Sequence, residues 1–178
     1  MKHSQCKTCR EATIFKKDAR KTFVMFVGLS SKPGTKALCP TTNSGKLIGE
    51  IESRVAETFS VHKTNLVKCA PLDEKGKLRY PTLAEMKACL PRLIEEIEHF
   101  QPRIIVPLGG QVTKFMISTL MTNQRFDGFA NDFRYQTFSL NGSLLLPVHH
   151  PSYIWVYRRK FIPQYIGAVG DRLLEAVY

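Results

Sequence analysis

Cysteine and histidine residues carry the clearest chemical signals in this sequence of 178 residues. Cys6 and Cys9 form a Cys-x-x-Cys pair in a polar, basic segment, and three further cysteines follow downstream. A thioredoxin-type redox pair lies between a strand and a helix, and no strand is expected before Cys6. The pair therefore predicts two ligands of a metal or cluster site, provided that two more thiolates complete the set.

Polar side chains and glycine turns mark the ends of the apolar segments. Asn65 lies at the end of one such segment, and His150 follows another. Two further segments end at Gly28 and at Gly109-Gly110. Because the carboxyl ends of parallel strands meet at one edge of a sheet, we expect these four ends to form a binding site.

The elements that position these residues are apolar strands alternating with amphipathic helices. Strands are expected at 22–29, 61–68, 103–108 and 144–148, with a short edge strand near 133–139. Helices are expected at 44–59, 82–100, 111–121 and 158–176. Thr82 and Glu85 form a capping box for the second of these helices. The alternation predicts an α/β fold, a three-layer α/β/α sandwich with a central four-stranded parallel sheet in a single domain of residues 1–178.

The composition excludes several classes of protein and favours one class of partner. Hydrophobic residues make up 43% of the chain, too many for a disordered protein, and no apolar run approaches a membrane span. We therefore expect a soluble, cytoplasmic protein without a membrane partner. Lys and Arg number 26 against 15 Asp and Glu, and residues 1–36 hold nine of these cations. This excess of positive charge favours a protein that binds nucleic acid over one whose basic surface serves only its solubility.

Four segments resemble, in order, the motifs of the uracil-DNA glycosylase superfamily. They are Val27-Gly28-Leu29, Thr64-Asn65-Leu66-Val67-Lys68-Cys69, Pro102-Arg103-Ile104-Ile105-Val106-Pro107-Leu108-Gly109 and His150-Pro151-Ser152. The second and fourth segments are the specific ones. The chain is most similar to the iron–sulfur types of this superfamily, families four and five.

The resemblance implies a metal centre held by four cysteines. The matching residues are Cys6, Cys9, Cys69 and Cys89. Four thiolates suit a 4Fe-4S cluster or a tetrahedral zinc ion, and the resemblance favours the cluster. Cys39 has no counterpart in these families and is interpreted as a loop or core thiol.

The resemblance also implies roles for residues at the strand ends. Gly28, Leu29, Asn65 and Ser152 would bind the base, and the Asn65 amide would donate to O4 of uracil while its carbonyl accepts from N3–H. His150 would donate a hydrogen bond to the charge that develops on the departing base. The alternatives are a turn-capping role for Asn65 and a structural loop role for His150.

A segment after His150 has the character of a DNA-contacting loop. Tyr153-Ile154-Trp155 is followed by Arg158-Arg159-Lys160. We expect Tyr153, Arg158 and Arg159 to contact DNA, with an apolar wedge that helps to extrude the base. The alternative is that Ile154 and Trp155 begin a core helix.

Two positions depart from the family patterns. Family four has Gly-Glu-Ala-Pro-Gly where this chain has Gly28-Leu29-Ser30-Ser31-Lys32, so a water-orienting carboxylate is missing; family five also lacks an acid there. Thr41–Gly45 occupies the place of the family's base-stacking loop, and Pro40 stands where an aromatic is expected. Ser30 or Asn43 is therefore the expected group that positions water.

These observations predict a monomeric, monofunctional DNA glycosylase that hydrolyses the N-glycosidic bond of uracil or of a related deaminated or modified base. The first alternative is an inactive member of the superfamily that only binds nucleic acid or recognises a modified base. The others are a domain of a phage or mobile-element system and, more remotely, an enzyme that does not act on DNA.

Overall fold

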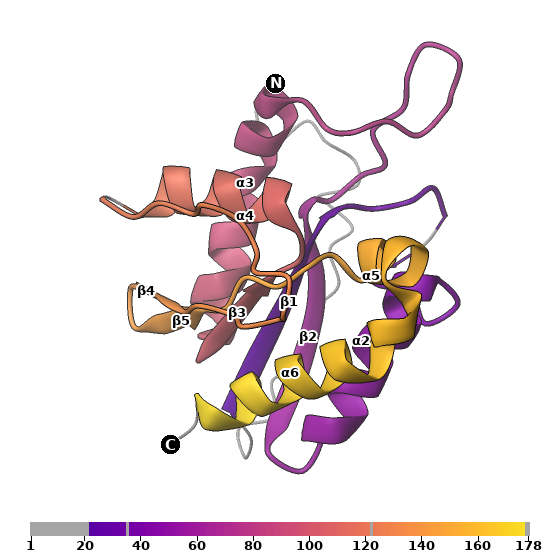
Figure 1. Ribbon diagram of the computed structural model, residues 1–178. Coiled ribbons are helices and arrows are strands. Elements are labelled where there is room, and N and C mark those ends of the chain that lie inside the picture. Colours follow the sequence, from indigo (N-terminus) through magenta and orange to yellow (C-terminus); the bar gives the residue numbers. More distant parts are fainter. Residues whose placement is uncertain (1–21, 35, 122, 177–178) are drawn as a thin grey trace.

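The computed structural model describes residues 22–34, 36–121 and 123–176. Its centre is a five-stranded sheet in the order β2-β1-β3-β5-β4 (Figure 1). The strands are β1 (Thr22–Ser30), β2 (Phe59–Val67), β3 (Ile104–Pro107), β4 (Phe138–Leu140) and β5 (Ser143–Leu145). Strands β2, β1, β3 and β5 are parallel, whereas β4 pairs antiparallel with β5.

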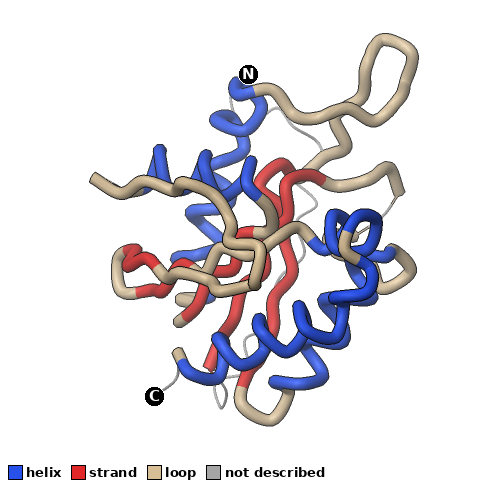
Figure 2. Tube along the Cα trace, in the orientation of Figure 1, coloured by secondary structure: helices blue, strands red, loops and turns tan. Residues whose placement is uncertain are grey.

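Helices cover both faces of this sheet (Figure 2). On one face lie α2 (Asn43–Val55), α5 (Pro151–Tyr157) and α6 (Ile162–Glu175), and on the other α3 (Leu83–Phe100) and α4 (Gly110–Leu120). Alternate residues of β1 enter the two cores: Val24 and Phe26 pack with the first group of helices, Met25 and Val27 with the second. The expected α/β/α sandwich is therefore confirmed.

The sheet has one strand more than the expected four. The fifth strand, β4, is shorter than the expected edge segment and joins β5 through Asn141-Gly142, both with positive φ (46° and 88°). An Asn-Gly pair favours a tight turn of this kind, and such a turn can only produce an antiparallel pair. Phe133 and Tyr135 lie before β4 and are buried in the core.

The expected last helix, 158–176, is also divided differently. Pro151 begins α5 directly after His150, because a residue before proline avoids the helical region and proline suits the first turn of a helix. Arg158 has φ −132° and ψ 30°, which ends α5, and the 3₁₀ turn η2 (Arg159–Phe161) leads into α6. The His-Pro-Ser motif is thus the start of a helix of its own.

The strand order places a crevice at one edge of the sheet. The chain runs from β1 to β2 on one side, and β3 then pairs with the other side of β1. Ligands bind at such switch points, beyond the carboxyl ends of the strands. Among the described residues, no helix is long and apolar enough to cross a membrane.

Candidate active site

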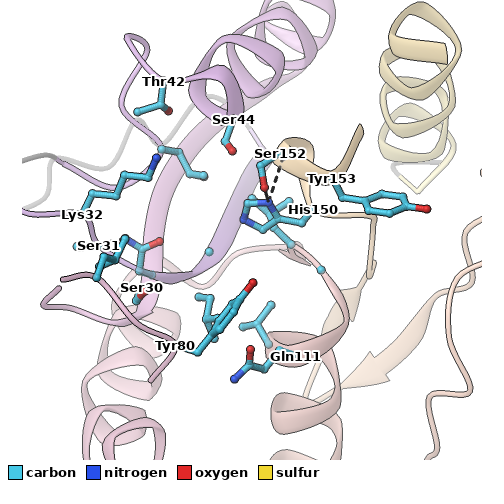
Figure 3. A pocket seen from close by; sticks show the side chains of 18 of the residues that line it. Ser30, Ser31, Lys32, Thr42, Ser44, Tyr80, Gln111, His150, Ser152 and Tyr153 are labelled. Atoms are coloured by element: carbon cyan, nitrogen blue, oxygen red, sulfur yellow. Dashed lines mark hydrogen bonds between the residues drawn. The ribbon is translucent and has the colours of Figure 1, made fainter. Parts of the chain in front are cut away.

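A cavity of about 680 Å³ opens at the carboxyl ends of β1, β2 and β3 and beside the start of α5. This volume lies within the range of about 300–1,000 Å³ that is typical of ligand sites. Of the residues expected at the site, the following line it: Gly28, Leu29, Ser30, Asn65, His150, Ser152 and Tyr153. Figure 3 labels Ser30, His150, Ser152 and Tyr153 among them. The strand ends therefore converge as expected.

Asn65 is buried and its amide is oriented by neighbours. It lies opposite Gly28 in the parallel register of β1 and β2, with only 4% of its surface exposed. Its Nδ2 donates to the Ser31 hydroxyl at 3.0 Å, while a Cβ placed on Gly28 would overlap its Oδ1. One N–H and the carbonyl oxygen of the amide remain to meet a ligand edge.

His150 rests on the second glycine turn. Gly109 has φ +93°, and a Cβ placed there would lie 3.0 Å from Cβ of His150. The Gly109 N–H donates to the Val148 carbonyl at 2.8 Å, which ties this turn to the segment that leads into His150. The glycine thus permits both the turn and the close approach of the imidazole.

The protonation state of His150 follows from its contacts. Burial lowers the pKa of His150 from 6.5 to about 4, with a further contribution from the Lys32 ammonium. Nδ1 accepts the Ser152 backbone N–H at 3.1 Å and lies 2.7 Å from the Ser152 hydroxyl. Since a backbone N–H can only donate, Nδ1 carries no proton. The ring is therefore neutral near pH 7, with its proton on Nε2.

The neighbouring His149 belongs to the core. Its Nδ1 lies 3.0 Å from the Tyr135 hydroxyl, and its carbonyl accepts from the Tyr165 hydroxyl at 3.0 Å. Burial, followed by the charge of Arg158, lowers its pKa to about 4. His149 does not line the cavity, so only His150 of this pair faces it.

Of the two residues expected to position water, Ser30 and Asn43, only one lies at the cavity. Ser30 lines the cavity, whereas Asn43 begins α2 and is exposed outside it. Its neighbours Thr42 and Ser44 line the cavity instead, and the Thr42 hydroxyl caps α2 by accepting from Gly45 N–H. No Asp or Glu is among the described residues that line the cavity.

The segment after Ser152 divides between the core and the rim of the cavity. Ile154 is fully buried and Trp155 packs against the core, which supports the core-helix alternative for both. Tyr153, Val156 and Tyr157 face the cavity and are 40%, 64% and 73% exposed. Their spacing of three and four residues places them on one side of α5.

Arg158 and Arg159, the arginines expected to contact DNA, lie in different surroundings. Arg158 donates to the side-chain and backbone oxygens of Asn131 at 3.3 and 3.0 Å, and its guanidinium lies over the Phe133 and Phe161 rings. Arg159 is exposed and lies over the Trp155 ring. The cations that line the cavity are Lys32, Lys36 and Arg79, none of which was singled out from the sequence.

Two of the four expected metal ligands are described, and Cys6 and Cys9 lie outside the described residues. Cys69 and Cys89 are half-buried cysteines that pack against the same hydrophobic cluster. Lys68 lies near enough to Cys89, and Arg79 near enough to Cys69, for their charges to interact, so a cation lies near each of the two cysteines. This donor set fits a thiolate-bound centre. Within the described part of the chain alone, three metal-binding side chains do not cluster anywhere.

Comparison with known proteins identifies the family. The sequence model of the uracil DNA glycosylase superfamily matches residues 17–173. The chain belongs to this superfamily. The matched range includes every strand of the sheet and the helices α2 to α5 around the cavity.

Individual relatives agree with this assignment. The type-4 uracil-DNA glycosylase of Sulfurisphaera tokodaii is 30% identical over 121 residues, which cover 67% of this chain and 45% of that protein. The type-4 uracil-DNA glycosylase of Saccharolobus solfataricus is 31% identical over 129 residues, 71% of this chain and 52% of that protein. The chain thus spans about half the length of the curated relatives it matches.

A solved structure matches at the level of the fold. The crystal structure of Pedobacter heparinus SMUG2 superimposes with a TM-score of 0.58 at 13% identity, covering 87% of this chain and 76% of that one. At this identity the likeness supports the α/β/α architecture alone.

Proposed function

We propose that this protein is a monofunctional DNA glycosylase that removes uracil, or a related deaminated or modified base. The observation that carries the proposal is the common pocket of Asn65 and His150, each set against a glycine of a different strand end. The type-4 uracil-DNA glycosylases among the relatives support the same reaction.

The two side chains divide the recognition and the chemistry between them. Asn65 would donate to O4 of an extruded uracil and accept from N3–H; cytosine presents the opposite groups at both positions. The Nε2–H of His150 would donate to the base oxygen on which negative charge develops. The bond from C1′ to the base breaks, water supplies a hydroxyl to C1′, and a proton from that water neutralises the base.

Water must be held without a carboxylate. Ser30 is the group from the sequence analysis that lines the cavity, and we propose it as the residue that orients the water. The absence of Asp and Glu from the described lining is also the observation that favours the alternative function, an inactive member that binds DNA or recognises a modified base.

The four cysteines Cys6, Cys9, Cys69 and Cys89 would hold a 4Fe-4S cluster. When bound, the cluster would cross-link three parts of the chain: the segment with Cys6 and Cys9, the loop with Cys69 that follows β2, and helix α3 with Cys89. We expect the purified protein to contain iron and to absorb visible light, and Cys39→Ser to leave the iron content unchanged. If metal analysis finds one zinc ion per chain and no iron, the four cysteines hold zinc and the cluster proposal is wrong.

A single assay tests the function. Duplexes and single strands that carry uracil, hypoxanthine, xanthine or hydroxymethyluracil are incubated with the protein, and abasic sites are revealed by alkali. We expect excision by the wild type, and a rate about 10²–10³ lower for His150→Ala with DNA binding retained. Binding without excision of any base in the panel would contradict the proposal and support the inactive alternative.

A further inference from the structure

Residues 71–81, here called the tyrosine arm, form a loop that projects from the body of the protein between β2 and α3 (Figure 1). A bridge between Leu72 and Leu78 closes the loop on itself. Tyr80 lies near the end of the arm, directly before Pro81 and two residues before Thr82, the cap of α3.

Tyr80 combines high exposure with a place at the cavity. It is 77% exposed, more than any other large hydrophobic side chain in the described part of the chain, and it lines the same cavity as Asn65 and His150. Figure 3 shows its ring reaching from the arm toward His150, between Ser30 and Gln111. Leu78, Val156 and Tyr157 are also exposed and line the same cavity, so Tyr80 belongs to a group of exposed apolar side chains of the kind that marks a binding site.

The other two tyrosines at the cavity already have ring partners. Tyr153 stacks on His149 with ring centres 5.7 Å apart, and Tyr157 lies 5.4 Å from Tyr153. Among the described residues, no aromatic ring packs against Tyr80. Of these three rings, Tyr80 therefore has its faces available to a ligand.

The end of the tyrosine arm is fastened to α3. Arg79 binds both carboxylate oxygens of Glu85 at 2.8 Å, and it also donates to the carbonyls of Tyr80 and Leu72 at 3.0 and 3.1 Å. Glu85 in turn accepts from the Thr82 N–H in the capping box. Arg79, followed by the Thr82 N–H, lowers the pKa of Glu85 to about 2, so this link is ionised at neutral pH. The arm thus holds Tyr80 at a defined position.

We propose that Tyr80 is the aromatic wall on which the extruded base stacks. Residues Thr41–Gly45 contain no aromatic side chain, so the segment that faces the tyrosine arm across the cavity cannot provide this contact. Stacking on Tyr80 would hold the plane of a pyrimidine, while Asn65 reads its edge. The inference rests on the proposed function and assigns the stacking role to a loop that the sequence motifs do not include.

The test measures binding, not turnover, and isolates the base. Two fluorescent single strands are compared by anisotropy: one carries 2′-fluoro-arabinouridine, whose glycosidic bond resists cleavage, and the other carries a tetrahydrofuran abasic analogue at the same position. The ratio of their affinities is the contribution of the base. We expect Tyr80→Ala to reduce this ratio about tenfold to 100-fold and leave the affinity for the tetrahydrofuran strand unchanged.

Two variants complete the test. Tyr80→Phe retains the ring and should retain the ratio, and Leu83→Ala, exposed but outside the cavity, should change neither affinity. A wild-type ratio that persists in Tyr80→Ala would overturn the inference and leave the proposed function standing. A wild type that does not distinguish the two strands would overturn both.

Discussion

The floor and the rim of the cavity are built in different ways. The floor consists of Gly28, Asn65, Gly109 and His150, at the ends of paired strands and the start of α5. The rim consists of Tyr80, Tyr153, Val156 and Tyr157, on the tyrosine arm and on one side of α5. The floor residues are held by the backbone of the sheet and by the hydrogen bonds of Asn65 to Ser31 and of Ser152 to His150, whereas the rim residues are exposed by 40% or more.

Under the proposed function, this difference separates two tasks. Reading a base edge and stabilising a charge require atoms that stay within a few tenths of an ångström, and the strand ends provide that constraint. Binding DNA requires exposed aromatic and basic side chains that can contact the bases and the phosphates. The rim provides exposed aromatic side chains beside the cations Lys32, Lys36 and Arg79. Substitutions in the floor should therefore change chemistry and base choice, and substitutions in the rim should change affinity.

The largest effect is expected for Asn65→Asp in the floor. A carboxylate cannot donate to Ser31 as the amide does, but the Ser31 hydroxyl can rotate and donate to it, so the fold should persist. It presents only acceptors to O4 of uracil, and a site built to donate there should lose excision of uracil by a factor on the order of 10⁴. Single-turnover rates on uracil and cytosine strands measure the change, with cytosine favoured relative to the wild type. Unaltered preference for uracil would contradict the role of Asn65.

A smaller loss is expected for Gly28→Ala. The added Cβ would overlap Oδ1 of Asn65 and displace the amide, and a displacement of about 1 Å can cost about 10² in rate. Gly49→Ala is the matched control, because Gly49 lies in α2 with open space around its Cα, and alanine favours the helix by up to about 1 kcal/mol. Equal excision rates for the two variants, measured beside their thermal unfolding midpoints, would show that Gly28 does not position Asn65.

The smallest effect separates two basic residues. Lys36 lines the cavity, so Lys36→Ala should reduce the slope of log affinity against log salt by about 1 for every DNA sequence. Arg158 is bound to Asn131 and packed over two aromatic rings, so Arg158→Ala should lower the midpoint of thermal unfolding and leave the salt slope unchanged. A lower salt slope for Arg158→Ala with an unchanged unfolding midpoint would show that Arg158 contacts DNA, as expected from the sequence.

The sequence predicts the floor more fully than the rim. Apolar strands that end in glycine, Asn65 and His150 locate the site, because parallel strand ends must meet at one edge. The contact between Ser31 and Asn65 is not visible in the sequence, since it depends on how the chain turns after β1. Asn43 shows the same limit: the helix cap falls on Thr42, and this places Asn43 outside the cavity.

The rim depends on tertiary contacts that have no periodic signal. Tyr80 lines the cavity beside Arg79, whose ion pair with Glu85 joins the tyrosine arm to α3. Tyr157 and Val156 could be found only once α5 is recognised as a separate helix, with Ile154 turned to the core. Pro163, in the first turn of α6, is the sequence signal that a new helix begins shortly after Arg158.

The state of the His150 imidazole tests the account most directly. Long-range proton–nitrogen NMR spectra across a pH titration, assigned with His150→Gln, report both its tautomer and its pKa. We expect a neutral ring with the proton on Nε2 from pH 8 down to pH 5, and protonation only near pH 4. Because the unfolded histidine binds a proton near pH 6.5, the stability linked to this group should fall as the pH drops from 6.5 to 4. A pKa near 6.5, or a proton on Nδ1, would contradict a neutral Nε2–H donor at the floor of this site.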